Sequence, residues 1–238
     1  MHANAPIRFH QVTLSRGSTN VYRDLSLELA ESRIGLIGDN GAGKSSLFRL
    51  ICGLDAPSRG EVSVCGHPAT DLPPGTVGMM FQNPDEQILF PTVEEELAFS
   101  LSASGTPRRE ARTRARDFLA DRGLSDWTDR AIGSLSQGQR QHVCWLAMVI
   151  ASPRILLLDE PFASLDLPSQ ALLQRSIDCA VQQVIVSTHQ LGHVRDFGRV
   201  IWIDQGRVRA DGPGHEVCAA YEADVHRRLA GSTQSLRA

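Results

Sequence analysis

The stretch that decides the fold is residues 38–45, GDNGAGKS, which follows the apolar run IGLI at 34–37. Four consecutive apolar residues predict a short buried strand, and the glycine-rich stretch predicts a tight loop. Residues 45–52 (SSLFRLIC) then predict a helix that Gly53 can end. A strand, a GxxxxGKS/T loop and a helix in this order predict a loop whose backbone N–H groups converge on phosphate oxygens.

Lys44 lies within this loop and is the only lysine of the chain, since the other 23 of the 24 basic residues are arginines. A lysine at this position reaches phosphate oxygens as a compact charge on a flexible stem, whereas a planar guanidinium is bulkier and favours a bidentate partner. The retention of lysine at this one position therefore favours nucleotide binding.

Length and composition narrow the class of protein. A chain of 238 residues can form one well-buried domain, or one domain with a small subdomain. The net charge of −3 argues against a general nucleic-acid binder. The five cysteines have no CxxC spacing, which is typical of thiols in a reducing compartment. No apolar run approaches the roughly 20 residues of a membrane helix or resembles a signal peptide, so we expect a cytosolic protein.

The remaining pattern predicts an α/β chain. Strand-like runs appear before and after a stretch of about sixty residues with helical periodicity, and they lie at 7–14, 25–29, 61–64, 77–81, 155–158 and 184–187. Thr92 and Glu95 predict a capping box at the start of the helical stretch, and Pro107 marks the start of a second helix. We expect a single domain, 1–238, with a mostly parallel core sheet and a helical subdomain inserted at about 92–150.

A second chemical element is the pair Asp159 and Glu160, which ends the apolar run 155–158. Asp159 at the carboxyl end of a strand can hold Mg²⁺ together with the hydroxyl of Ser45. Glu160 can polarise a water directed at the γ-phosphate. Two carboxylates can also simply end a strand, but a phosphate-binding loop in the same chain favours the chemical interpretation.

Further motifs reveal a family resemblance. LSQGQ at 135–139 precedes the Asp159 strand, His189 follows the next strand in the sequence VSTH, and Gln82 ends the run VGMMF. Together with Asp166 and the phosphate-binding loop, these motifs resemble, in order and spacing, the ATPase subunit of an ABC transporter. The resemblance extends from about residue 7 to residue 215. It implies an ABC-type P-loop NTPase fold, with an antiparallel β part near the N-terminus.

The resemblance assigns a role to each matching position. Glu160 is implied as the catalytic base, with Gln82 and His189 sensing the attacking water and the γ-phosphate. Mg²⁺ is implied to be held by Ser45, Gln82 and Asp159, partly through water. The loop that binds ATP, the Walker A motif, is implied to comprise Gly38, Asp39, Asn40, Gly41, Ala42, Gly43, Lys44, Ser45 and Ser46.

The resemblance also implies a head-to-tail pair of ATPase subunits. The signature residues act on the ATP held by the opposite subunit, and Asp166 communicates across that interface. The signature residues are Ser136, Gln137, Gly138 and Gln139. Gln137 departs from the family pattern, which usually has glycine there, so we expect function with altered affinity.

A second departure concerns the adenine base. The family usually places an aromatic residue there, just after the first strand, but the alignment puts Arg16 at that position. Tyr22 falls on a position that is normally apolar. Because a guanidinium can stack on a base, Arg16 is our candidate for contacting adenine.

Two other patterns allow competing interpretations. Five arginines within 108–116 resemble a nucleic-acid patch, but acidic residues interleaved at helical spacing favour a solvated helix face; these are Glu110, Asp117 and Asp121. His189 and His193 have the i,i+4 spacing of a metal pair, but no third ligand candidate is near in sequence.

Residues 81–99, which begin FQNPDEQ and continue PTVEEELAF, resemble the ATPases of energy-coupling-factor (ECF) transporters. This resemblance implies an ATP-hydrolysing subunit, peripheral to the cytoplasmic face of the membrane, that energises import of a vitamin or a transition-metal ion. Biotin is our first choice of cargo, followed by cobalt or nickel. The implied partners are a second ATPase subunit, a transmembrane coupling protein and a membrane substrate-binding subunit, with no nucleic acid.

Other functions stay open from the sequence alone. The chain could serve a different ABC importer, or it could be a non-transport ABC ATPase, although those usually carry coiled-coil insertions or a second ATPase domain. A P-loop kinase would not need the LSQGQ motif or His189.

Overall fold

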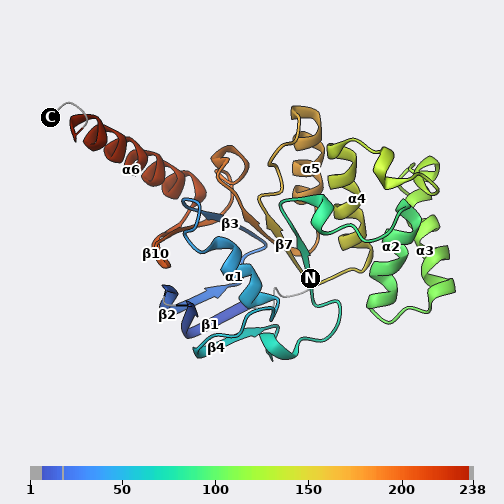
Figure 1. Cartoon of the computed structure of the whole chain (residues 1–238), viewed down its shortest axis with the longest axis horizontal. Coiled ribbons are helices and arrows are strands. Elements are labelled where there is room, and N and C mark those ends of the chain that lie inside the picture. Colours follow the sequence, from blue (N-terminus) through green and yellow to red (C-terminus); the bar gives the residue numbers. More distant parts are fainter. Residues whose placement is uncertain (1–6, 18, 236–238) are drawn as a thin grey trace. The chain divides into compact units, whose positions relative to one another are not determined.

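A computed structural model describes residues 7–17 and 19–235, including side chains as far as residue 230. The chain divides into two compact units (Figure 1). The first unit comprises Met1–Thr70 and Ile185–Ala238, and the second is the intervening segment Asp71–Val184. The boundary falls inside strand β8 (Gln183–Ser187).

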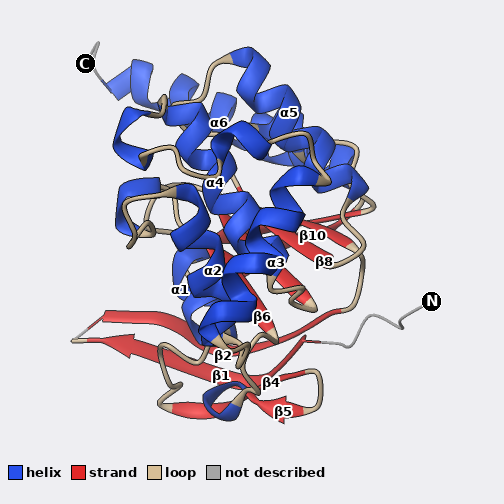
Figure 2. Ribbon diagram, turned by 90° about the vertical axis from the view of Figure 1, so that its right-hand side faces the viewer, coloured by secondary structure: helices blue, strands red, loops and turns tan. Residues whose placement is uncertain are grey.

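The first unit contains an antiparallel sheet of strands in the order β2-β1-β4-β5 (Figure 2). These strands are β1 (Ile7–Arg16), β2 (Thr19–Leu29), β4 (Arg59–Val64) and β5 (His67–Pro68). The antiparallel β part expected near the N-terminus is confirmed. Strand β2 begins earlier than the predicted start at residue 25, because Ser15 pairs with Asn20 and the hairpin ladder continues through a polar stretch that lacks alternation.

A second group of strands in this unit runs largely parallel. Strand β3 (Arg33–Ile37) pairs in parallel with β9 (Arg199–Asp204), and β10 (Arg207–Gly212) pairs antiparallel with β9. On the other side of β3, the Thr188 N–H just after β8 donates to the Leu36 carbonyl at 3.0 Å. Helix α1 (Lys44–Ile51) follows β3, and helix α6 (Gly214–Ser235) follows β10. The burial of residues 34–37 explains why this part of β3 is a continuous apolar run.

The second unit combines two parallel strands with the expected helical insertion. Strand β6 (Val77–Met80) pairs with β7 (Ile155–Asp159). Helix α4 (Gln137–Ile150) packs so closely on β6 that a Cβ atom on Gly78 would lie 2.6 Å from the Met148 side chain. The helices are α2 (Val93–Ala103), α3 (Arg108–Ala120), α4 (Gln137–Ile150) and α5 (Leu167–Cys179).

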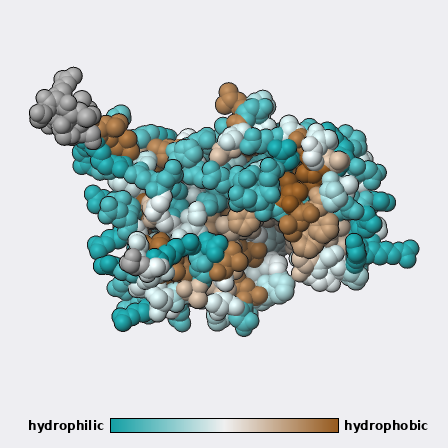
Figure 3. Space-filling view, in the orientation of Figure 1, coloured by the Kyte–Doolittle hydropathy of each residue, from teal (hydrophilic) through white to brown (hydrophobic). Residues whose placement is uncertain are grey.

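Short 3₁₀ turns connect the main elements; they are Ala69–Asp71, Pro84–Glu86, Ser125–Trp127, Ile132–Ser134 and Leu191–His193. Figure 3 shows that hydrophobic residues gather in a patch over the helices of the second unit. No helix in the described part of the chain combines the length and the apolar character that crossing a membrane requires.

The predicted start of α2 is confirmed in position but differs in detail. Thr92 caps the helix by accepting the Glu95 N–H at 3.4 Å. Its hydroxyl also donates to the Glu95 carboxylate at 2.9 Å. In a complete capping box that carboxylate would instead accept the backbone N–H of Thr92. The predicted start of α3 at Pro107 is confirmed.

The arginines of α3 form ion pairs, as expected of a charged helix face, but with a partner that the sequence did not indicate. Arg112 and Arg116 both bind the buried carboxylate of Glu94 on α2, at 2.7 and 2.5 Å. Arg114 has a helical-spacing partner among the interleaved acids, Glu110 at 3.9 Å. Periodicity could not reveal Glu94, because the two helices meet only in the folded unit.

Candidate functional site

The glycine-rich loop lies in the first unit, between β3 and α1, as predicted. Gly38, Gly41 and Gly43 all have positive φ values, of 142°, 80° and 118°. A Cβ on Gly38 would lie 2.1 Å from the Ile203 carbonyl oxygen of β9, so a side chain cannot be accommodated there. Backbone geometry favours glycine at all three positions, and close packing also requires it at Gly38 and Gly43.

Lys44 is 6% exposed, and its ammonium group lies against the loop itself. The Nζ atom donates to the carbonyls of Gly38 at 2.8 Å and Asp39 at 3.2 Å. Gly43 is the N-cap of α1, and no side-chain bond caps this helix start among the described residues. The uncapped N–H groups and the positive end of the helix dipole favour an anion at this position.

Tyr22 contacts the glycine-rich loop at Gly43, and the sequence did not predict this contact. The side chain is 1% exposed, and its hydroxyl donates to the Gly43 carbonyl at 2.7 Å. Burial raises the pKa of Tyr22 well above its ordinary value, so the hydroxyl keeps its proton. An aromatic residue at a normally apolar position was the available signal, because a buried tyrosine hydroxyl needs a partner.

Arg16, the candidate for contacting adenine, ends strand β1 in the same unit. Its guanidinium donates to the Asp55 carboxylate at 2.6 Å, and Arg49 of α1 binds the same carboxylate through two bonds of 3.0 and 2.9 Å. Hydrogen bonding by Arg49 is the largest influence that lowers the pKa of Asp55. Arg16 is therefore anchored by a carboxylate, and its side chain is half exposed.

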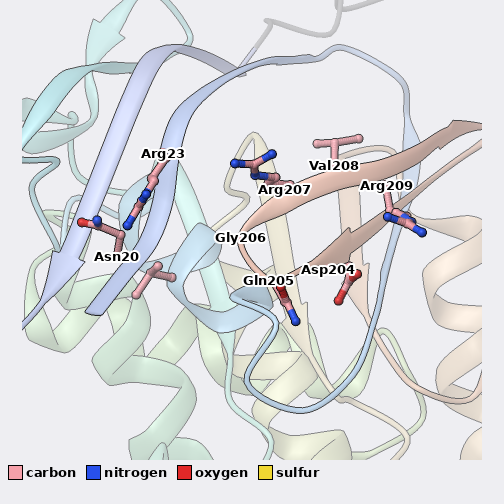
Figure 4. A pocket seen from close by; sticks show the side chains of 9 residues that line it. Asn20, Arg23, Asp204, Gln205, Gly206, Arg207, Val208 and Arg209 are labelled. Carbon is pink, nitrogen blue, oxygen red and sulfur yellow. The ribbon is translucent and has the colours of Figure 1, made fainter. Parts of the chain in front are cut away.

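A cavity of about 560 Å³ lies beside the loop, between β2 and the turn that joins β9 to β10 (Figure 4). The turn packs against the loop, because the Gly206 N–H donates to the Ala42 carbonyl at 3.1 Å. Three arginines give the cavity a basic lining, and they are Arg23, Arg207 and Arg209. None of the predicted site residues lines this cavity.

His189 follows β8 in the first unit, where its side chain is exposed. Two hydrogen bonds hold the preceding residue, Thr188. Its N–H donates to the Leu36 carbonyl, and its hydroxyl accepts the Gln190 N–H at 3.0 Å. The backbone just before His189 is therefore held in place by hydrogen bonds.

The second unit holds the predicted catalytic carboxylates. Asp159 is the last residue of β7 and is half buried, and Glu160 follows it with only 8% of its surface exposed. Glu160 has a φ of 48°, which is unusual for a residue with a side chain. Backbone strain of this kind is common at functional sites.

Gln82 lies just beyond β6 and is exposed. The segment after it folds on itself, because Asn83 caps the 3₁₀ turn by accepting the Asp85 N–H at 3.1 Å, while the Gln87 side chain accepts the Phe81 N–H at the same distance. This order fixes the backbone on both sides of Gln82.

The signature residues form the start of α4. Ser136 and Gln139 make a complete capping box, with each side chain accepting the other residue's backbone N–H. Gln137 is exposed, and Gly138 lies against α5, where an added Cβ would be 2.2 Å from the Ser169 hydroxyl. Asp166 caps α5 by accepting the Ser169 N–H at 3.0 Å. Hydrogen bonding by Ser169, first by its side chain and then by its backbone, lowers the pKa of the Asp166 carboxyl.

The predicted residues thus divide between the two units. The Walker A loop, Arg16 and His189 belong to the first unit, and Gln82, the Asp159–Glu160 pair, the signature and Asp166 belong to the second. Within the described residues, no cluster of three or more His, Cys, Asp or Glu side chains has the arrangement of a metal site.

Strand β3, the glycine-rich loop and helix α1 define a P-loop nucleotide-binding protein. The sequence profile of the family described as ABC transporter matches residues 22–163. The chain belongs to this ABC transporter family, and it is an ATP-hydrolysing ATP-binding protein. The predictions of family, fold class and enzymatic activity are confirmed.

Individual relatives agree with this assignment. The biotin transport ATP-binding protein BioM of Rhodobacter capsulatus is 47% identical over 215 residues, which cover 89% of this chain and 92% of that protein. BioM of Rhizobium etli is 37% identical over 217 residues, covering 90% and 97%. A solved structure of CbiO1 from Clostridium perfringens, part of the ABC transporter complex CbiONQ, shares the fold with a TM-score of 0.77, at 24% identity and 98% coverage of both chains.

Proposed function

We propose that this chain is the ATPase subunit of an ECF-type importer, with biotin as the first-choice cargo and cobalt or nickel as alternatives. The observation that carries the proposal is the 47% identity to a biotin transport ATP-binding protein over nearly the full length of both chains. The ECF-like segment 81–99 supports the same class of importer.

In this proposal the first unit binds the nucleotide phosphates. The N–H groups of the loop and the first turn of α1 hold phosphate oxygens, and Lys44 turns from its loop carbonyls toward the β- and γ-phosphates. ATP is then held by residues 38–46, with Arg16 at the adenine.

The chain's candidate ligands fit Mg²⁺ by their chemistry. Ser45, Gln82 and Asp159 all offer oxygen donors, which is the ligand type that Mg²⁺ prefers. When bound, the ion would neutralise charge on the phosphates.

Glu160 acts as general base for the attacking water, Gln82 orients that water, and His189 contacts the γ-phosphate. The burial of Glu160 favours this assignment, because a base in a water-poor setting interacts strongly with a single positioned water.

The signature of one subunit acts on the ATP held by a second ATPase subunit, and Asp166 contributes to that interface. Ser136 and Gly138 face the γ-phosphate, with Gln137 and Gln139 beside them. ATP binding then favours the closed pair, and hydrolysis shifts the equilibrium back to the open state.

A transmembrane coupling protein docks on the helical part of the second unit, at the cytoplasmic face of the membrane. A groove of about 290 Å³ supports this, because Phe90, Ala98 and Phe99 give it an apolar part. The two phenylalanine rings lie 5.0 Å apart, and the remaining lining is polar or charged: Glu95, Ser102, Arg108 and Arg112. Phe99 and Leu89 are large apolar side chains exposed nearby.

The test of the function is co-purification of the tagged full-length chain from solubilised membranes of its host, followed by mass spectrometry. We expect one coupling membrane protein and one small substrate-binding membrane protein, and the latter identifies the cargo. Recovery with the permease of another importer class, or with soluble partners alone, would contradict the ECF assignment.

The catalytic assignment has its own test in Glu160→Gln, which keeps the size of the side chain but removes the base. We expect ATP binding to persist while hydrolysis falls roughly 10²–10⁴-fold. Hydrolysis at the parent rate would show that another group acts as the base.

A further inference from the structure

Helix α6 reaches back onto the Walker A loop at Asp39. The Tyr221 hydroxyl donates to one carboxylate oxygen of Asp39 at 2.7 Å, and the Arg228 guanidinium donates to the other at 2.5 Å. A second, longer bond of 3.4 Å joins Arg228 to the first oxygen. Tyr221 and Arg228 are two helical turns apart and so lie on one face of α6.

Helix α6 is anchored in the first unit at Tyr221 and at the residue that follows it. The Tyr221 ring packs edge-on against Trp202 of β9, with centroids 5.4 Å apart. Glu222 forms an ion pair with Arg195, and Arg228 also binds Asp224 on its own helix at 3.0 Å. These contacts hold α6 in the first unit, and Arg228 on the same helix binds Asp39.

The contacts of Tyr221 and Arg228 with Asp39 affect the charge of the glycine-rich loop. Arg228 and then Tyr221 lower the pKa of Asp39, so the group is a carboxylate at neutral pH. Burial, followed by the bond to Asp39, raises the pKa of Tyr221 to about 12, so its hydroxyl keeps the proton that it donates. An anionic side chain in a loop that binds a triphosphate would repel the ligand unless its charge were neutralised.

The same residue also contacts the phosphate-binding lysine. The Asp39 carbonyl accepts a hydrogen bond from Lys44 Nζ, while its carboxylate is held by α6. Asp39 thus connects the C-terminal helix to the part of the loop that receives the phosphates.

We propose that Arg228 and Tyr221 of α6 are positioning residues that neutralise and restrain Asp39, and thereby raise the affinity of the Walker A loop for ATP. This inference rests on the proposed role of residues 38–46 in binding ATP. For charges on the order of 10 Å apart in water, the uncompensated carboxylate weakens ATP binding roughly three- to tenfold.

The test compares Arg228→Gln with the matched control Arg227→Gln in the full chain. Arg227 is the neighbouring residue of α6 and pairs with Asp224 at 3.0 Å but not with Asp39. We expect Arg228→Gln to raise the dissociation constant of ATP three- to tenfold at low salt, and much less at 1 M salt because of screening. The control should bind as the parent does, and Arg228→Gln should raise KM for ATP more than it lowers kcat.

A rescue separates charge from helix docking. In the double variant Asp39→Asn with Arg228→Gln, the carboxylate that needs neutralising is gone, so we expect ATP to bind more tightly than in Arg228→Gln alone. Tyr221→Phe keeps the ring on Trp202 and removes only the hydroxyl, so we expect a smaller loss, of roughly two- to threefold. Thermal unfolding of each variant checks that the chain remains folded.

Two results would overturn the proposal. One is parent affinity in Arg228→Gln, and the other is a double variant that binds no better than Arg228→Gln alone, which would indicate a merely structural contact. Failure of the underlying function has a different signature, because the parent chain itself would then bind no ATP and Lys44→Ala would change nothing.

Discussion

Helix α1 in the first unit begins at Gly43 with no side-chain cap among the described residues, whereas helix α4 in the second unit begins at Ser136 with a closed capping box. Both helices start at motifs assigned to phosphate binding. The N-terminal N–H groups of α1 gain partners when an anion binds, whereas α4 satisfies part of its first turn by itself. We infer that α1 is organised for the phosphate contact proposed within its own chain, whereas α4 is capped before the contact proposed with the ATP of a second subunit.

The largest effect is expected at the α1 end, from Lys44→Arg. The charge is kept, but the bulkier guanidinium cannot replace the compact ammonium that we propose turns toward the phosphates, so the charge-assisted bonds proposed there are lost. We expect ATP affinity to fall roughly 100-fold in equilibrium binding. The control is Arg49→Lys, the reverse exchange on the same helix, which should change affinity little. Equal affinities for Lys44→Arg and the parent would remove our explanation of the single lysine.

At the α4 end, Ser136→Ala removes both the cap and the proposed contact to the partner's ATP. We expect the free energy of unfolding to fall by about 1 kcal/mol and the hydrolysis rate to fall roughly 10- to 100-fold. Thr92→Ala is the matched control, because it removes the N-cap of α2 at a site with no proposed phosphate contact. If both variants lose the same amount of activity, Ser136 serves only as a helix cap.

The glycines at the two helix starts should also respond differently. Gly43→Ala places a Cβ 2.8 Å from the Tyr22 hydroxyl at a φ of 118°, so we expect a loss of stability of about 2 kcal/mol. Gly138→Ala meets mainly the Ser169 hydroxyl, which can rotate away, so we expect a loss of about 1 kcal/mol. Urea unfolding measures both, and Ser169→Ala should recover part of the second loss. If Ser169→Ala restores none of the stability lost in Gly138→Ala, then backbone strain and not the contact with Ser169 causes that loss.

The smallest effect concerns pH and helix α4. His142 packs edge-on against Trp127, and burial, followed by the charge of Arg122, lowers its pKa. The unfolded chain therefore binds this proton more readily than the folded chain, so stability falls as pH drops below about 6.5. Between pH 7.5 and 5.5 we expect His142 to account for up to about 1 kcal/mol of lost unfolding free energy. His142→Gln should remove this part of the slope, and the exposed His215→Gln should not.

Sequence reasoning worked best where structure is local. The strand, loop and helix at 34–52 were predicted because glycine spacing and apolar runs act over a few residues. The capping bonds were harder, since Thr92 and Ser136 both match the capping pattern but only Ser136 closes the box. The assignment of catalytic roles to Glu160 and His189 stays a prediction, which the experiments above address.

The sequence alone determined the phosphate-binding loop, because positive φ at three glycines and one lysine in register are requirements of the local backbone. Only the tertiary structure decided what surrounds Asp39. Its partners Tyr221 and Arg228 lie 182 and 189 residues further along the chain, and no local pattern links them to the loop. Contacts of this kind arise when packed elements place distant side chains together, so charge neutralisation at Asp39 could be seen only in the folded chain.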